Sequence, residues 1–227
     1  QFLAEKELHR GISSSGLRQY ASIGKVHLLP VLAHKKAQSV TLNDWQKCID
    51  TAFTNSLTTG KPISKRMLKN IRAAMSAVYS YAQRQRIPLQ RPEGLIFPAT
   101  ATISKRTVLQ PSDIQTVFTH NEYANAAGEQ RTFWYIHLIR FILLTGLRPG
   151  EAIGIRPTED IQNDFLYIQR SINYHGEITP GKNENAQRAL FLSPTIKKII
   201  NDQQQMLREN GVISPWLFAN QTGDFAK

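Results

Sequence analysis

A nearly unbroken apolar run over residues 133–144 is the feature that most limits how this chain folds. The run is long enough for a helix buried on most sides, and it is too short and too polar to cross a membrane. Gly146 follows it, and glycine adopts the left-handed conformation past a helix end without a side-chain penalty. Pro149 then suits the first turn of a second helix, with Glu151 close behind. The pattern predicts two helices joined by a tight turn, with Arg148 at the start of the second.

Arg148 is therefore a candidate for holding an anion. Free backbone N–H groups and partial positive charge gather at a helix start, and a guanidinium placed there can bind two phosphate oxygens at once. The simpler interpretation is a structural ion pair between Arg148 and Glu151 on an ordinary turn. The motif alone favours the simpler interpretation, and only its context favours a phosphate site.

The positive charge of the chain is concentrated in its first half. The protein has 227 residues and a formal net charge of +11. Residues 1–108 hold 17 Lys and Arg against 5 Asp and Glu, whereas residues 109–227 hold 11 against 12. A folded basic module attached to a neutral one most often binds nucleic acid, although a basic face can also simply be solvated.

The helix expected over residues 65–86, capped by Ser64, is the most informative part of the basic half. At helical spacing it has one apolar face and one cationic stripe, formed by Lys65, Lys69 and Arg72 with Arg66 beside them. Such a stripe can neutralise successive DNA phosphates while carrying little sequence information. A solvated face remains the alternative.

Composition shifts divide the chain into segments. We expect the remnant of an upstream region with a linker over residues 1–16, a helical DNA-binding domain over 17–87, an irregular linker over 88–107 and a second domain over 108–227. The linker adds three cations, Arg91, Lys105 and Arg106. Because the chain begins without Met and stops just after a turn-like segment, we expect a fragment cut at both ends.

Past Arg148 the pattern changes from helix to strand. Strand formers dominate residues 164–172 and 188–192, with a shorter candidate at 177–179. Lys182 lies in the polar stretch between the last two and is expected at a hairpin tip, where a long cation can reach into a groove. The expected fold is mainly α with a small antiparallel β-sheet.

The sequence disfavours disulfides, metal sites, secretion and membrane insertion. Cys48 is the single cysteine, which leaves no disulfide and no cysteine metal site within the chain and fits a reducing compartment. His120 and His137 have no partners at ligand spacing, so we expect no metal. Neither a signal peptide nor a transmembrane run is recognisable.

Two motifs, in this order and at this spacing, resemble those of the tyrosine recombinases of the phage-integrase family, in the type that mobile genetic elements encode. Leu143-Leu144-Thr145-Gly146-Leu147-Arg148-Pro149-Gly150-Glu151 resembles the first arginine motif, and Lys182 with Arg188-Ala189-Leu190-Phe191-Leu192 resembles the β-hairpin lysine region. The basic half resembles the core-binding domain, and the resemblance covers about residues 14–227. It implies the N-terminal part of an α+β catalytic domain, truncated before the His-x-x-Arg motif and the nucleophilic tyrosine.

The resemblance implies a site-specific DNA recombinase or integrase that cleaves and rejoins strands through a 3′-phosphotyrosyl intermediate, without a metal, ATP or another cofactor. Arg148 would stabilise charge on the pentacoordinate phosphate, Lys182 would protonate the departing 5′-oxygen, and Glu151 would orient Arg148. A fragment without the nucleophile should bind DNA and not cut it.

The same resemblance implies double-stranded DNA as the partner and a tetramer on two DNA sites, with accessory DNA-bending or directionality proteins. It implies no membrane association and a cytoplasmic location in association with the nucleoid DNA, for a protein of bacterial or phage origin. One alternative is a non-catalytic DNA-binding or architectural protein, which explains the charge and gives no reason for Arg148 and Lys182. An RNA-binding module would use Phe165, Tyr167 and Phe191 as a platform, but the positive charge lies in the helices instead.

Overall fold

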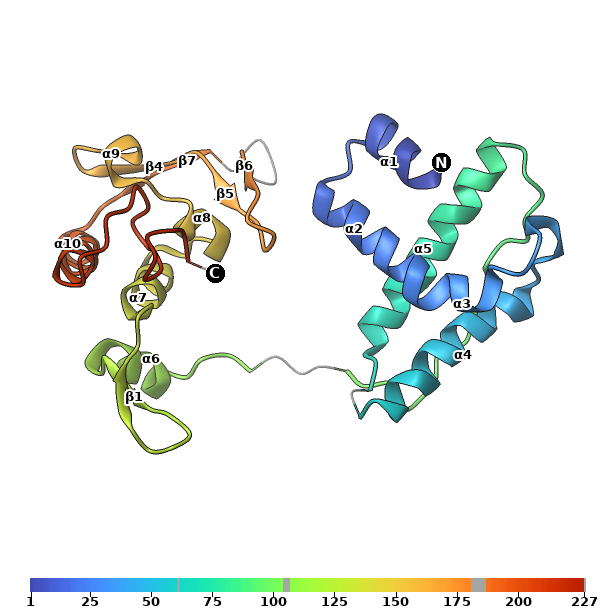
Figure 1. Cartoon of the computed structure of the whole chain (residues 1–227), viewed down its shortest axis with the longest axis horizontal. Coiled ribbons are helices and arrows are strands. Elements are labelled where there is room, and N and C mark those ends of the chain that lie inside the picture. Colours follow the sequence, from blue (N-terminus) through green and yellow to red (C-terminus); the bar gives the residue numbers. More distant parts are fainter. Residues whose placement is uncertain (61, 104–106, 181–186, 227) are drawn as a thin grey trace. The chain divides into compact units, whose positions relative to one another are not determined.

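The computed structural model describes residues 1–60, 62–103, 107–180 and 187–226, in two compact units (Figure 1). The first unit is Gln1–Thr107 and the second is Val108–Lys227. Helices predominate and the strands form small antiparallel sheets, which confirms the predicted fold class. Across the described residues, we find no helix with the length and apolar character needed to span a bilayer.

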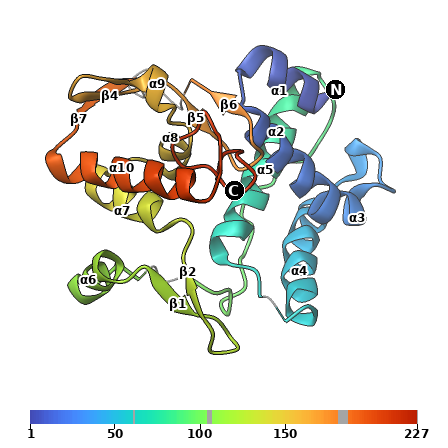
Figure 2. The same cartoon turned by 60° about the vertical axis from the view of Figure 1, so that its left-hand side comes forward.

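The first unit is built from helices. Its elements are α1 Phe2–Arg10, α2 Ser14–Ile23, the π-helical turn η1 Gly24–Leu28, α3 Leu29–Leu32, the 3-10 turn η2 Ala37–Ser39, α4 Leu42–Thr58 and α5 Lys65–Arg84. Both α2 and α4 pack on α5 (Figures 1 and 2). The Ser64 hydroxyl accepts a hydrogen bond from the Met67 amide at 3.2 Å, so α5 begins where the sequence predicted.

The apolar faces of α4 and α5 form the core of this unit. Trp45, Ile49, Leu68 and Met75 are at most 1% exposed. Cys48 is buried among them, and this burial raises the pKa of its thiol to about 12. Cys48 is thus a core residue with an unreactive thiol.

Residues 1–16 were expected to be a remnant and linker, but most of them form helices that pack on this unit. The ring of Phe2 in α1 makes edge contacts with Tyr20 and Tyr81, each with centroids 5.7 Å apart. Glu5 forms an ion pair with Arg84 at the end of α5. These apolar and ionic contacts order the segment, and neither was visible in the local composition.

Much of the expected linker over residues 88–107 is also packed. The indole nitrogen of Trp45 donates to the carbonyl of Gln90 at 2.9 Å. Gln46 donates to the Ile96 carbonyl at 2.8 Å and accepts from its amide at 2.9 Å. The chain satisfies its backbone groups on α4 instead of forming a helix or strand of its own.

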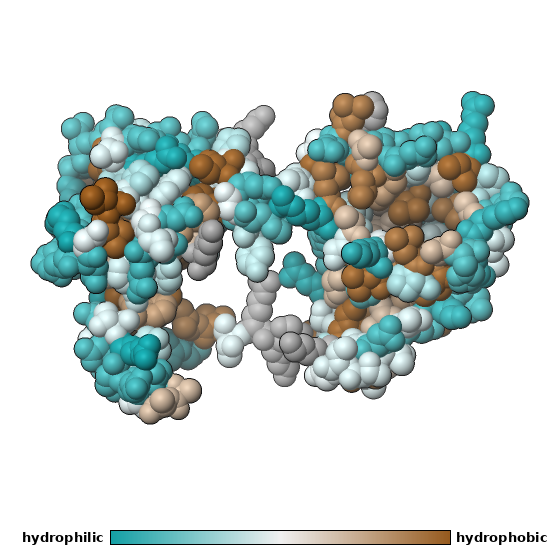
Figure 3. All heavy atoms as spheres, in the orientation of Figure 1, coloured by the Kyte–Doolittle hydropathy of each residue, from teal (hydrophilic) through white to brown (hydrophobic). Residues whose placement is uncertain are grey.

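Hydrophobic side chains of the first unit show between hydrophilic ones on the face in Figure 3. The exposed apolar residues of this unit include Leu8, Val26 and Leu29. Exposed apolar side chains of this kind are ordinary on a folded protein and need no partner to explain them.

The second unit combines helices with short strands. Its elements are α6 Pro111–Thr119, β1 Glu122–Ala124, β2 Gln130–Thr132, α7 Ile136–Thr145, α8 Pro149–Ile153, α9 Pro157–Asp160, β3 Ile161–Gln162, β4 Phe165–Ile168, β5 Ser171–Ile172, β6 Ile178–Thr179, β7 Arg188–Phe191 and α10 Pro194–Glu209. The strands pair as β1-β2, β3-β4-β7 and β5-β6, all antiparallel. α7 packs against α8 and α10.

The strand predictions need two corrections. The stretch 164–172 was expected to be one strand, but it divides into β4 and β5, which belong to different sheets. Within the described residues, β7 pairs with β4 and β6 pairs with β5, whereas the sequence predicted a hairpin between β6 and β7. The polar stretch before α7 carries the hairpin β1-β2.

A buried aromatic contact anchors α7. Phe141 is fully buried, and its ring lies 5.2 Å from that of Phe218 in the apolar segment after α10. Gly146 ends α7 with a left-handed φ of 64°. The chain then turns into α8, which contacts β5. The predicted helix, its end at Gly146 and the start of a second helix at Pro149 are confirmed.

Gly150 permits this close approach of α8 to β5. A Cβ atom at position 150 would lie 2.5 Å from the backbone oxygen of Ile172 and 2.6 Å from the hydroxyl of Ser171. Gly150→Ala should therefore lower the free energy of unfolding of the second unit by about 1–3 kcal/mol, the usual cost of overpacking. Thermal and denaturant unfolding measure the change. Gly24→Ala is the control, since that helical position has no atom within 4 Å of a Cβ, and equal stability loss in both variants would contradict the account.

Candidate active site

Arg148 occupies the N-cap position of α8, directly after the turn that ends α7. Leu147 before it is 3% exposed and belongs to the core, which fixes the backbone at this point. The Arg148 side chain itself is 62% exposed. A rigid, buried turn thus presents a guanidinium to solvent at the position that the sequence predicted.

Glu151 holds Arg148 in place. Its carboxylate is 3% exposed and accepts from the Arg148 amide at 3.1 Å through Oε2 and from Nη1 of Arg148 at 2.8 Å through Oε1. The ion pair expected from the simpler interpretation is therefore present. It engages only one nitrogen of the guanidinium, and Nε and Nη2 have no partner among the described residues. The structural and anion-binding interpretations are compatible.

Arg188 is a further member of the site and was not among the predicted site residues. It lies on β7 opposite Ile168 of β4, and its guanidinium contacts the Glu151 carboxylate. Nη2 donates to Oε2 at 2.8 Å and Nη1 to Oε1 at 3.5 Å. The sequence signal for it was alternation, because Arg188, Leu190 and Leu192 fall on the same face of the strand. A charged residue on the face that carries these leucines needs a partner of opposite charge.

The two arginines keep Glu151 ionised. Burial by itself would raise the pKa of this carboxyl, but the hydrogen bonds from Arg188 and Arg148 outweigh burial and lower it. One carboxylate lies between two guanidiniums, so the cluster carries a net charge of about +1 at neutral pH. Such a cluster attracts an anion to its exposed member.

A second buried acid in the same unit shows what a purely structural pair looks like. Asp160 is 2% exposed and accepts from Nη1 of Arg170 at 2.6 Å. The Arg170 side chain is only 14% exposed and also contacts Glu159 and the carbonyl of Gly154. Arg148 differs from Arg170 because most of its guanidinium remains open to solvent.

No protein-family model matches this chain, and no curated protein matches it in sequence. Several solved structures, in contrast, match the structure of this chain. The Tn1549 transposon integrase in complex with transposon right-end DNA has a TM-score of 0.71 at 16% identity, over 100% of this chain and 72% of that chain. A lambda integrase dimer bound to a core site has a TM-score of 0.68 at 16% identity, over 100% and 74%. XerH recombinase bound to its difH substrate has a TM-score of 0.60 at 16% identity, over 96% and 60%.

The chain has the tyrosine-recombinase fold. This confirms the predicted resemblance at the level of architecture. Within this tyrosine-recombinase fold, Arg148 and Glu151 come together as expected. Lys182, which the sequence predicted to be catalytic together with Arg148, lies outside the described residues.

The predicted DNA-binding residues lie in or next to the first unit. Lys65, Arg66, Lys69 and Arg72 are exposed along α5. The Arg72 guanidinium lies 5.4 Å from the centre of the Phe97 ring, which restricts its position. Arg91 is 67% exposed and makes a 3.5 Å contact with Glu93. The remaining two, Lys105 and Arg106, fall outside the described residues.

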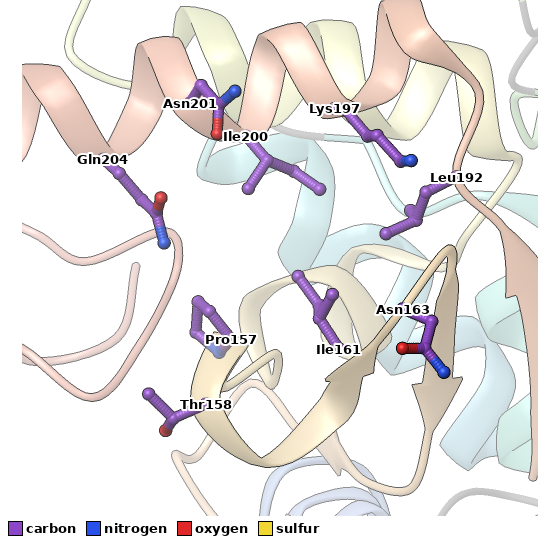
Figure 4. Close-up of a pocket in the computed structure, with 9 residues that line it drawn as sticks. All are labelled: Pro157, Thr158, Ile161, Asn163, Leu192, Lys197, Ile200, Asn201 and Gln204. Carbon is purple, nitrogen blue, oxygen red and sulfur yellow. The ribbon is translucent and has the colours of Figure 1, made fainter.

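A separate hollow of about 450 Å³ lies between α10 and the α9-β3 segment (Figure 4). Ile161, Asn163 and Pro157 line one side, with Ile200 and Gln204 of α10 on the other. Lys197 is the one cation among the described residues that line it, and it is ion-paired with Asp164. The mixture of amide and apolar groups offers no nucleophile and base in contact, so the hollow is a poorer candidate site than the Arg148 cluster.

His120 and His137 of the second unit have structural surroundings. Burial, followed by the charge of Arg140, lowers the pKa of His137 and keeps it neutral. His120 caps the end of α6 near the Thr116 carbonyl. In the part of the chain that the structure describes, no three His, Cys, Asp or Glu side chains are grouped closely enough to hold a metal ion.

Replacing Glu151 tests how much the cluster stabilises the second unit. Glu151→Gln should lower the free energy of unfolding at neutral pH by about 1.5–3 kcal/mol, the range for hydrogen bonds to charged groups. The pKa of Glu151 is lowered from 4.5 on folding, so this stabilisation is complete above pH 4.5 and disappears as the pH falls through the folded value. Denaturant unfolding at a series of pH values measures it.

The difference in the free energy of unfolding between wild type and Glu151→Gln should therefore become smaller at acidic pH. Glu129→Gln is the matched control in the same unit, because Glu129 pairs with Arg131 on the surface and is 62% exposed. It should change stability far less. A wild-type advantage over Glu151→Gln that stays constant down to the most acidic pH would contradict the assignment.

Proposed function

We propose that the protein is a DNA strand transferase of the tyrosine-recombinase type, a site-specific recombinase or integrase. The observation that carries the proposal is Arg148, whose exposed guanidinium is fixed by a buried turn and by Glu151. Support comes from the solved structures of similar fold, which are integrases and recombinases bound to DNA.

The proposed chemistry is phosphoryl transfer. A tyrosine hydroxyl attacks a DNA phosphorus, the bond to the 5′-oxygen breaks, and a 3′-phosphotyrosyl link keeps the bond energy for rejoining. Negative charge on the non-bridging oxygens is greatest near the transition state, where fixed cations lower the barrier most. In this proposal Nε and Nη2 of Arg148 contact those oxygens. Lys182 protonates the departing 5′-oxygen, and no metal or other cofactor takes part.

The nucleophile is not assigned to any residue of this chain. None of the seven tyrosines stands in the sequence context expected of the nucleophile after a His-x-x-Arg motif. We therefore propose that these 227 residues bind DNA without cleaving it. The domain roles follow: a core-binding domain over 17–87 and the catalytic domain from 108.

The proposed partner is double-stranded DNA in the cytoplasm, for a protein of bacterial or phage origin. A lambda integrase tetramer bound to a Holliday junction is among the structures of similar fold, with a TM-score of 0.67 at 16% identity, over 100% of this chain and 60% of that chain. A tetramer on two DNA sites is accordingly the proposed assembly, with accessory DNA-bending or directionality proteins as additional partners.

The cationic stripe of α5 is the proposed backbone contact of the first unit. Lys65, Lys69 and Arg72 recur at about one-turn spacing, and each is exposed while Leu68 and Ile71 between them are fully buried. The core thereby fixes the direction in which the stripe faces. Cations in one row on a rigid rod can contact successive phosphates of one strand.

Replacing Lys65, Lys69 and Arg72 together by Ala should flatten the dependence of log affinity on log salt. Each lost phosphate contact should reduce the slope by about 0.9, so the triple variant should lose up to about 3. Fluorescence anisotropy with a labelled duplex at several salt concentrations measures the slope.

The matched control removes the same charge elsewhere in the first unit. Lys25, Lys36 and Lys47 are exposed on η1, before η2 and on α4. Their combined replacement by Ala should leave most of the slope in place. Equal slopes for the stripe variant and wild type would assign the stripe to a solvated face.

Arg148→Ala tests the proposed reaction in the longest natural form of the protein. Strand cleavage should fall below detection, because loss of one preorganised donor alone costs about a hundredfold to a thousandfold in rate. Binding should largely persist, since the first unit supplies most phosphate contacts. The assay follows the covalent protein–DNA product on a nicked suicide duplex.

A wild-type rate of cleavage by Arg148→Ala would contradict the proposed role. A wild-type protein that binds the duplex and yields no covalent product would instead favour the alternative, a non-catalytic DNA-binding or architectural protein. Arg156→Ala serves as the control, because that arginine lies over the Trp216 ring, 4.3 Å from its centre, and should not affect cleavage beyond its effect on folding.

A further inference from the structure

Arg188 has contacts that set it apart from the other exposed cations of the second unit. Both terminal nitrogens of its guanidinium point at one buried carboxylate, that of Glu151. The same carboxylate holds the Arg148 amide and Nη1. We propose that Arg188 is a positioning residue that neutralises Glu151, so that Arg148 presents an uncancelled positive charge to a DNA phosphate. This inference rests on the proposed function, in which Arg148 binds that phosphate.

Arg188 changes the net charge of the cluster formed by Arg148, Glu151 and Arg188. Arg148 and Glu151 alone form a neutral pair, with the carboxylate 2.8 Å from a nitrogen of the guanidinium that is to receive the phosphate. A phosphate bound to Arg148 would approach that carboxylate and be repelled. The second guanidinium, 2.8 Å away on Oε2, changes the net charge from zero to about +1 and offsets the repulsion.

The strand β7 fixes the direction from which Arg188 reaches Glu151. Arg188 begins β7, which is held against β4 by the register pairs Ile168↔Arg188 and Leu166↔Leu190. A strand in a sheet moves less than a loop, so the Arg188 fork reaches Glu151 from a fixed direction. Its two N–H groups orient the carboxylate with one lone pair of each oxygen left for Arg148. Glu151 can then serve the α8 N-cap and the Arg148 guanidinium at the same time.

Neutralisation of Glu151 and simple support of the fold predict different effects of removing Arg188. If Arg188 only stabilised the second unit, its removal would weaken phosphate binding through loss of structure, and removal of the Glu151 charge would not restore it. If Arg188 acts by neutralising Glu151, a neutral residue at position 151 should compensate for its loss. The double variant Glu151→Gln/Arg188→Ala is therefore the decisive protein. It also leaves no buried carboxylate without Arg188, which destabilises the fold less than removing Arg188 alone.

The test follows phosphate binding at Arg148 itself. The full 227-residue chain is labelled with ¹⁵N, and the Nε–Hε signal of Arg148 is identified from its absence in Arg148→Lys. The probe is a thymidine dinucleotide, which carries one phosphodiester and avoids the many contacts of a duplex. Its affinity is taken from the shift of that signal, and circular dichroism confirms that each variant is folded.

Arg188→Ala should weaken dinucleotide binding by at least about tenfold, which corresponds to about 1.4 kcal/mol. Arg188→Lys should recover part of the affinity, because it restores the charge and not the two-pronged contact. Glu151→Gln/Arg188→Ala should recover most of it. If Arg188→Ala does not fold, the double variant alone decides the question: affinity near that of wild type supports the proposal, and lost affinity overturns it.

The outcomes also separate this inference from the proposed function. Binding by folded Arg188→Ala that equals wild type, or a double variant no better than the single one, overturns the role of Arg188 and leaves the phosphate contact of Arg148 intact. A wild-type Arg148 signal that does not respond to the dinucleotide overturns both.

Discussion

The carboxylate of Glu151, buried between two guanidiniums, is the interaction on which the candidate site depends. An ionised carboxylate at 3% exposure is stable only with strong donors on both oxygens, and Arg148 and Arg188 supply them. The same acid caps α8 through the Arg148 amide. One residue thereby connects the backbone of the turn, the strand β7 and the exposed guanidinium, so that fold and site share a single set of contacts.

The surrounding fold makes this arrangement rigid. Phe141 and Phe218 anchor α7 in the core, and the left-handed Gly146 turns the chain abruptly into α8. Gly150 lets α8 approach β5 so closely that a side-chain carbon would collide with the backbone of Ile172. A cation on such a scaffold does not have to be ordered when a phosphate binds, which is the physical basis of preorganisation. The cationic stripe on α5 is held in the same way, because the buried Leu68 and Ile71 fix the direction in which its cations face.

The elements that carry strong local sequence signals, such as caps, helix-ending glycines and helical periodicity, were predicted from the sequence. The apolar run, Gly146 and Pro149 placed Arg148 at a helix start, and Ser64 with the helical period placed the stripe on α5. What the sequence missed depends on contacts between distant segments. Arg188 meets Glu151 only because β7 pairs with β4, and residues 88–98 are ordered by Trp45 and Gln46 on α4. The division of 164–172 into two strands likewise reflects pairing partners, which no local pattern encodes.

A structure of this chain bound to duplex DNA should place the Arg148 guanidinium within hydrogen-bonding distance of a backbone phosphate, with Glu151 still held by both arginines. The decisive measurement is the distance from Nε and Nη2 of Arg148 to the nearest phosphate oxygens. Contacts of about 2.7–2.9 Å would agree with a charge-assisted hydrogen bond. A complex in which the DNA is bound and Arg148 faces solvent, away from every phosphate, would contradict the central claim.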